Sequence, residues 1–203
     1  MNIQNAVIFI TVLLLTVVSF PAAAQTPERF MKTPADYEGP FYPKTVQHDE
    51  DNDLVHVAGR SNPAQGDILN LHGVVLNTRG EPQNNLVIEI WQTDPQGRYK
   101  HPGSSTPEQL DPDFQYCGRT RTGADGSFSF KTLVPSPYQT RPSHIHYKVW
   151  QNGGVLLTSQ IYIRKSSDTK KPYSATPSAI DLQTMELTPV EPGVFEGFFQ
   201  IVL

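Results

Sequence analysis

Cysteine is nearly absent from this sequence, since Cys117 is the only one in 203 residues. A single cysteine cannot form an intramolecular disulfide, so packing and any bound metal must stabilise the folded chain. We interpret Cys117 as a small buried apolar residue rather than a catalytic thiol, because free cysteine is among the most buried residue types.

Clusters of lysine or arginine are also absent. The formal net charge is -4, so the sequence offers no electrostatic reason to expect nucleic acid as a partner. Hydrophobic residues make up 37% and charged residues 18%, which is typical of a globular protein. The length suits one domain with a hydrophobic core.

The only long apolar run lies at the N-terminus, where Ala6–Phe20 is followed by Pro21-Ala22-Ala23-Ala24. An apolar segment that ends in an A-x-A site is the pattern of a secretory signal peptide, although the first five residues contain no lysine or arginine. We expect residues 1–24 to be a cleaved signal peptide and residues 25–203 to form the domain. The mature protein is then exported, periplasmic or extracellular, without stable membrane insertion. An uncleaved membrane anchor is the alternative.

The body of the chain has no convincing amphipathic helix. Its 18 prolines and 14 glycines favour short strands joined by turns. Strand-like runs are 67–76, 86–92, 127–132, 143–151, 155–164 and 194–203. A helical turn is expected near Pro177. The pattern predicts an all-β fold, an antiparallel β-sandwich with long loops, preceded by an irregular wrapping arm over residues 25–65.

The stretch Val134–Trp150 contains the pair His144 and His146. Residues two apart in a strand point to the same side, so both imidazoles can bind one metal ion. Two half-buried structural histidines would give the same pattern. Tyr138 precedes the pair in a proline-flanked loop, and Tyr99 follows another predicted turn. Phenolates and imidazoles together suit iron(III), but spacing alone cannot place the tyrosines on a metal, and isolated tyrosines are more often packing residues.

Several ordered motifs make the chain resemble the intradiol ring-cleavage dioxygenases, in particular the protocatechuate 3,4-dioxygenase catalytic subunit. The resemblance runs from about Glu38 to the C-terminus. The matching motifs are Glu38-Gly39-Pro40-Phe41-Tyr42, Ile88-Glu89-Ile90-Trp91-Gln92, Gly97-Arg98-Tyr99, Phe114-Gln115-Tyr116-Cys117-Gly118-Arg119, Pro137-Tyr138, Arg141-Pro142-Ser143-His144-Ile145-His146 and Phe199-Gln200-Ile201-Val202-Leu203.

The resemblance implies a mononuclear iron(III) centre that opens a catechol ring between its two hydroxylated carbons, with dioxygen as the second substrate. By position, the implied equatorial ligands are Tyr99 and His144, the axial ligands are Tyr138 and His146, and a solvent-derived hydroxide completes the set. Arg141 matches the arginine beside the reacting ring, and Gln160 matches a glutamine behind the ligands. The sequence leaves a homo-oligomer open.

Thr140 departs from the resemblance, because the protocatechuate enzymes have an aromatic residue two positions after the axial tyrosine.

Two other functional classes remain alternatives. A secreted β-sandwich binding module without catalysis would use the tyrosines for stacking and the histidines for structure. A cupin-type iron(II) or zinc enzyme would use the histidine pair with a third histidine, but no histidine follows His146.

Overall fold

The computed structural model describes residues 29–44, 49–164 and 177–203. The predicted signal peptide, residues 1–24, and the first residues of the predicted arm lie outside these ranges. Within them, no helix has the length and apolar character that a membrane span requires.

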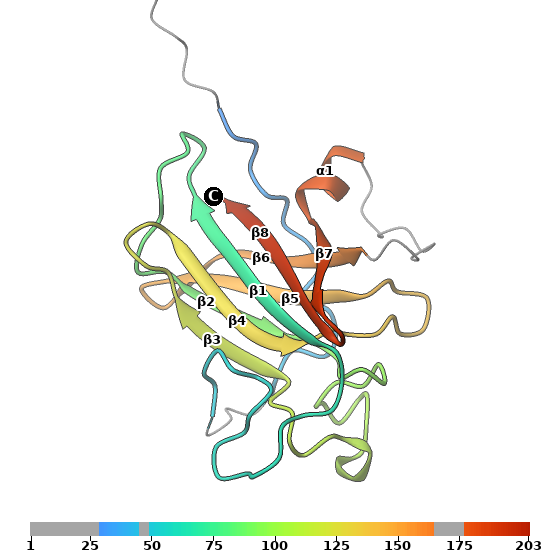
Figure 1. The fold of residues 1–203 in the computed structure, drawn as a ribbon. Coiled ribbons are helices and arrows are strands. Elements are labelled where there is room, and N and C mark those ends of the chain that lie inside the picture. The colour runs from blue at the N-terminus through green and yellow to red at the C-terminus, as the bar shows by residue number, and fades with distance from the viewer. Residues whose placement is uncertain (1–28, 45–48, 165–176) are drawn as a thin grey trace, which may run out of the picture.

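Eight strands form the framework of the described chain (Figure 1). They are β1 Ile68–Leu76, β2 Val87–Trp91, β3 Cys117–Arg121, β4 Ser127–Leu133, β5 His144–Gln151, β6 Gly154–Arg164, β7 Thr184–Glu191 and β8 Val194–Val202. A 3-10 turn spans Pro107–Gln109, and a short helix, α1, spans Pro177–Leu182. Asn152 and Gly153 join β5 to β6 with φ angles of 50° and 81°, as a tight hairpin turn requires.

The strands form two sheets that share β7. One sheet has the order β3-β2-β5-β6, and the other has the order β7-β8-β1-β4. The first residues of β7, from Thr184 to Glu186, pair with β6, and the residues from Leu187 onward pair with β8. This change of partner connects the two layers into one continuous sandwich.

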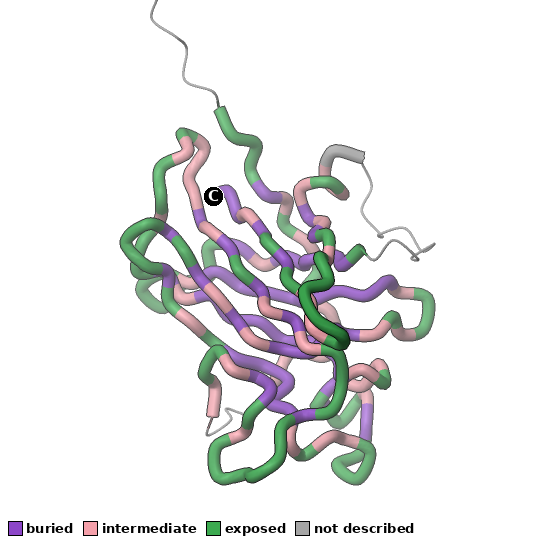
Figure 2. Tube along the Cα trace, viewed as in Figure 1, coloured by how far each residue is buried: buried purple, intermediate pink, exposed green. Residues whose placement is uncertain are grey.

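The core lies between the two layers, where Figure 2 shows the buried segments gathered. Along β5, Ile145, Tyr147 and Val149 are 0% exposed and belong to the main apolar cluster. The Tyr147 ring lies 5.9 Å from the Phe199 ring of β8 in the opposite layer. Because strand side chains alternate, His144, His146 and Lys148 face the other side of the sheet.

The predicted all-β sandwich is confirmed, and so are the predicted helical turn at Pro177 and buried Cys117. The pairing differs from the prediction in two places, because β1–β8 and β6–β7 are parallel. Alternation of apolar residues predicts a strand but does not give the direction of its neighbour. Strands β3 and β7 were not expected, because charged residues interrupt both and Pro189 interrupts β7.

The predicted N-terminal arm wraps over the outer side of the β5–β6 sheet. Thr33 exchanges two hydrogen bonds with Val202, through its backbone N–H and its hydroxyl oxygen, each 2.9 Å long. Ser159 donates to the Pro34 carbonyl at 2.7 Å, and Asp36 donates its N–H to Thr158 at 3.0 Å. These bonds fix residues 33–36 against β6 and β8 and position the segment that follows them.

Gly73 has a testable role in the core. A Cβ at this position would overlap the Phe128 ring and lie 2.5 Å from the Phe199 carbonyl oxygen. We expect Gly73→Ala to lower the free energy of unfolding by about 1–3 kcal/mol, as overpacking does. Urea denaturation followed by circular dichroism measures this change.

Gly154→Ala is the matched control, because a Cβ there meets only the Gln151 carbonyl oxygen, at 3.6 Å. Its free energy of unfolding should stay within about 0.5 kcal/mol of the original protein. Equal losses in the two variants would contradict the assigned packing of Gly73.

Candidate functional site

His144 and His146 lie side by side on the outer face of β5. Their Nε2 atoms are 3.2 Å apart, and the two residues are 3% and 2% exposed. His144 Nδ1 lies 2.7 Å from the Pro142 carbonyl oxygen, which can only accept, so Nδ1 carries the hydrogen. The neutral His144 ring therefore directs the lone pair of Nε2 toward His146.

Tyr99 reaches the histidine pair from the loop after β2. Asp94, which is 0% exposed, organises this loop by accepting hydrogen bonds from the N–H groups of Gln96 and Arg98 at 2.9 and 3.0 Å. The Tyr99 hydroxyl lies 3.2 Å from His144 Nε2. Burial and the neighbouring Tyr138 raise the pKa of Tyr99 well above its usual range, so in this environment the phenol holds its proton.

Tyr138 completes a ring of four aromatic side chains around one point. Its ring lies 5.5 Å from the Tyr99 ring, edge to face, and 5.8 Å from the His144 ring. The loop turns at once after it, because Arg141 donates its N–H to the Tyr138 carbonyl at 2.8 Å and Gln139 has a φ of 48°. Unlike Tyr99, Tyr138 is only half-buried.

A cavity of about 360 Å³ opens beside the Tyr138 ring. Its lining residues are Phe41, Gln96, Gly97, Gly103, Ser104, Pro137, Tyr138 and Gln139. Tyr138 is thus the member of the aromatic group that borders open space.

Arg141 and Gln160 form a polar chain next to this group. The Arg141 Nη2 donates to Gln160 Oε1 at 2.5 Å, and Gln160 Nε2 donates to the Tyr37 carbonyl at 2.8 Å. The Arg141 Nε is buried and has no hydrogen-bond partner among the described residues. One donor of this guanidinium is therefore available for a ligand.

Burial and the Arg141 charge keep both imidazoles neutral. Burial, followed by Arg141, lowers the pKa of His144 to about 4. The pKa of His146 falls well below its usual range, because of burial first and then His144 and Arg141. At neutral pH both rings can therefore offer lone pairs to a cation without first losing a proton.

The donor atoms have the spacing that one metal ion needs. With the zinc–histidine bond of about 2.1 Å as a guide, two nitrogens about 100° apart around a metal lie about 3.2 Å from each other. The described residues contain no group of three or more histidine, cysteine, aspartate or glutamate side chains placed to hold a metal. The adjacent phenols of Tyr99 and Tyr138 fit the remaining positions, and phenolate oxygens suit a hard, trivalent ion.

Sequence reasoning missed several residues that support the histidines. The Trp91 ring stacks on His146 at 4.9 Å with an interplanar angle of 7°. Gly39 of the arm, with φ of 77°, lies so close that a Cβ would be 3.2 Å from His146 Cε1. Phe41 follows, 5.1 Å from the Tyr99 ring. Strand pairing places Trp91 opposite His146, and the alternation of β2 could have indicated this if the pairing had been known.

Lys148 fastens the arm over the site. Its ammonium lies 2.6 Å from the Glu38 carboxylate and 3.7 Å from the centre of the Tyr42 ring. Tyr42 in turn meets Trp91 edge to face at 5.0 Å. The arm therefore closes the side of His146 that the sheet leaves uncovered.

The structure brings all six predicted site residues into one neighbourhood. Tyr99, Tyr138, His144 and His146 surround a common point, and Arg141 and Gln160 lie behind it as a hydrogen-bonded pair.

The chain is similar to known proteins in both sequence and structure. A family model described as "Dioxygenase" matches residues 37–187. The protocatechuate 3,4-dioxygenase beta chain of Burkholderia cepacia is 33% identical over 120 residues, which cover 55% of this chain and 51% of the relative. A chlorocatechol 1,2-dioxygenase of Cupriavidus pinatubonensis is 30% identical over 148 residues, 64% of this chain and 54% of the relative.

Solved structures show the same fold. The dioxygenase domain of a dioxygenase carbohydrate-binding protein fusion from Streptomyces sp. SirexAA-E has a TM-score of 0.65 at 28% identity, and the match covers 85% of this chain and 98% of that chain. An intradiol ring-cleavage dioxygenase from Tetranychus urticae has a TM-score of 0.64 at 22% identity, with 85% and 94% coverage. The chain spans about half the length of the two sequence relatives above. The family match nevertheless covers most of the described residues, and it shows that the chain belongs to the intradiol ring-cleavage dioxygenase family.

Proposed function

We propose that this protein is an iron(III)-dependent intradiol dioxygenase, which inserts both atoms of dioxygen into a catechol and yields a muconate-type diacid. The observation that carries the proposal is the convergence of two neutral, buried imidazoles and two phenols on one point. The relatives named as chlorocatechol and protocatechuate dioxygenases support a catechol as the substrate class.

In this proposal Tyr99, Tyr138, His144 and His146 hold the ion. Iron(III), when bound, supplies Lewis acidity toward both catechol oxygens and the redox chemistry that dioxygen requires. The chain contributes the ligand geometry: the Pro142 carbonyl fixes the His144 tautomer, and Trp91 fixes the plane of the His146 ring.

Tyr138 is the proposed general base. Its ring is half-buried beside the cavity of about 360 Å³, so it can move where Tyr99, 2% exposed, cannot. A catechol must release its hydroxyl protons to bind a cation, and Tyr138, which would be a phenolate when the ion is bound, would accept one of them on its oxygen.

Arg141 is the proposed stabiliser of negative charge on the ring. Gln160 holds one side of the guanidinium at 2.5 Å, so the group keeps its orientation while its unpaired Nε stays available. A fixed positive charge in a site sheltered from water stabilises developing negative charge without reorganisation. The arm, through Gly39 and Phe41, excludes water from the far side of the ligands.

Export to the periplasm or the extracellular space remains a prediction from the sequence alone.

The first test concerns the metal itself. The iron-loaded protein should be coloured by a phenolate-to-iron(III) charge-transfer band, and Tyr99→Phe should shift or remove that band because one of two donor phenolates is lost. Visible absorption and metal analysis measure this. Tyr37→Phe is the matched control, since the Tyr37 side chain is 83% exposed, and its band should not change. A colourless protein that binds zinc at the same residues would contradict the ferric proposal.

The second test concerns turnover. The iron-loaded protein should consume dioxygen and catechol in equal amounts and form a muconate-type product. Tyr138→Phe should retain iron but slow kcat by about 10²–10⁴-fold, the usual effect of losing a general base, whereas His144→Ala should lose iron and activity together. An oxygen electrode with product identification by mass spectrometry measures both effects.

His72→Ala is the control for the histidine variant, because His72 is exposed on β1 in the other sheet. A secreted binding module, the alternative function, would hold no stoichiometric iron and consume no dioxygen. Full activity in both site variants would refute the ligand assignment.

The third test follows from the pKa shifts. The pKa of His144 is lowered to about 4, so above roughly pH 5 the imidazole has no proton to lose, whereas the raised pKa of Tyr99 means that its phenol must release one. Iron uptake should therefore release protons and become stronger as pH rises from 5 to 8. Uptake from a ferric chelate in a pH-stat measures the proton count, and Tyr99→Phe should release one proton fewer than the original protein. An unchanged count would show that Tyr99 does not bind the metal as a phenolate.

A further inference from the structure

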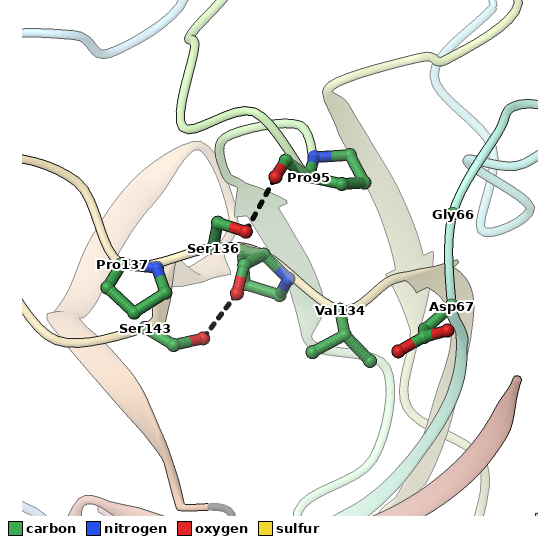
Figure 3. A pocket seen from close by; sticks show the side chains of 8 residues that line it. Gly66, Asp67, Pro95, Val134, Ser136, Pro137 and Ser143 are labelled. Carbon is green, nitrogen blue, oxygen red and sulfur yellow. Dashed lines mark hydrogen bonds between the residues drawn. The ribbon is translucent and has the colours of Figure 1, made fainter. Parts of the chain in front are cut away.

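Ser136 joins the two loops that carry the phenols of the site (Figure 3). Its hydroxyl donates to the Pro95 carbonyl oxygen at 2.6 Å. Pro95 belongs to the loop that leads to Tyr99, and Ser136 lies two residues before Tyr138. We propose that Ser136 is a positioning residue that fixes the Tyr138 phenol relative to the Tyr99 phenol. This inference rests on the proposed function of the site.

The Tyr99 side of this connection is rigid. Asp94 accepts hydrogen bonds from two backbone N–H groups and from the Tyr116 hydroxyl, the last at 3.1 Å, and its carboxylate is completely buried. The Tyr99 N–H donates to the Ser104 hydroxyl at 3.1 Å. Pro95 lies inside this hydrogen-bonded turn, so its carbonyl is a fixed point to which a second loop can be attached.

The Tyr138 side has few polar contacts of its own. Pro135 and Pro137 have no N–H group, so the chain on both sides of Ser136 cannot donate backbone hydrogen bonds. The Ser143 hydroxyl donates to the Pro135 carbonyl at 2.6 Å, and the Ser136 hydroxyl donates to Pro95. The hydroxyls of Ser136 and Ser143, both drawn in Figure 3, are thus the donors that hold this segment where the two prolines have no N–H group to donate.

Packing alone does not hold this strap, which we define as residues 134–137. A cavity of about 360 Å³ lies against it, and the strap itself forms part of the wall. The remaining lining residues are Gly66, Asp67, Pro95 and Ser143. Val134 is fixed by burial in the main apolar cluster and by donating its N–H to the Asp67 carbonyl at 2.8 Å, whereas Ser136 is half-buried and Pro137 is exposed. The end of the strap nearest Tyr138 therefore depends on the Ser136 hydrogen bond more than on close packing.

A shift of the strap would reach the phenols directly. Gly97, with φ of 78°, lies against Tyr138, and a Cβ there would be 3.1 Å from Tyr138 Cβ. The two loops therefore touch just where each turns toward the site. Releasing the bond between Ser136 and Pro95 should let Tyr138 move away from the common point without unfolding either loop.

The test compares Ser136→Ala, Ser136→Val and Ser136→Thr in the iron-loaded full chain. Threonine and valine have nearly the same shape, but only threonine keeps the hydroxyl. We expect the alanine and valine variants to shift the phenolate-to-iron(III) absorption band and to lose iron to a chelator about fivefold faster, the factor that corresponds to one ordinary hydrogen bond. Ser136→Thr should keep the original band and rate.

Ser127→Ala is the matched control, because the Ser127 hydroxyl also makes a 2.6 Å hydrogen bond, to Asp125 at the opposite end of β4 from the strap. It should change neither the band nor the rate of iron loss. Circular dichroism of each variant checks that the fold is intact.

The outcomes separate the two proposals. A normal band in the original protein together with an unchanged band and rate in the alanine and valine variants would overturn the positioning role alone. Equal behaviour of the threonine and valine variants would overturn it as well, since the hydroxyl would then be irrelevant. A missing band in the original protein would overturn the proposed function, and with it this inference.

Discussion

The alternation of side chains along β5 builds the core and the site at the same time. Ile145 and Tyr147 are completely buried between the sheets, and His144 and His146 lie on the opposite face, under the arm. A shift of the strand by one residue would exchange these two sets, so the hydrophobic effect that holds Ile145 inside also fixes the histidine pair outside. The geometry of the imidazoles is therefore as stable as the core itself.

The electrostatic state of the site follows from the same burial. Burial of the two imidazoles and of the Tyr99 phenol favours their neutral forms, and the Arg141 charge pushes the histidines further in that direction. The neutral Tyr99 phenol would resist ionisation until a strong positive charge arrives. In the proposed function that charge is a ferric ion, so selection for a trivalent cation would come partly from the cost of deprotonating Tyr99. The positive Arg141 nearby favours the anionic form of Tyr99 and reduces that cost.

Much of the fold could be predicted from the sequence, because local features determined it. Proline- and glycine-rich turns and alternating apolar residues located six of the strands, and the histidine pair follows from strand periodicity alone. Tyr99 and Tyr138 came from family resemblance. Tyr99 lies 45 positions before His144, and no local pattern links residues so far apart. Tyr138 is close to His144 in sequence, but it lies in a loop without the periodicity that would direct its side chain. Trp91, Gly39 and Asp94 were missed as supporting residues because their contacts depend on strand pairing and on the path of the arm. The parallel pairings were missed for the same reason.

The placement of β8 has a consequence for how the chain can reach this structure. β8 follows the other seven described strands in the sequence, yet it lies between β7 and β1, where it pairs with β1 in parallel and anchors Thr33 of the arm. Until Val194–Val202 has been synthesised, β8 is missing, and no pairing among the other described strands joins β1 and β4 to β7. Assembly of the two sheets into the sandwich is therefore expected to wait for Val194–Val202, with the slow kinetics typical of contacts between distant parts of a sequence.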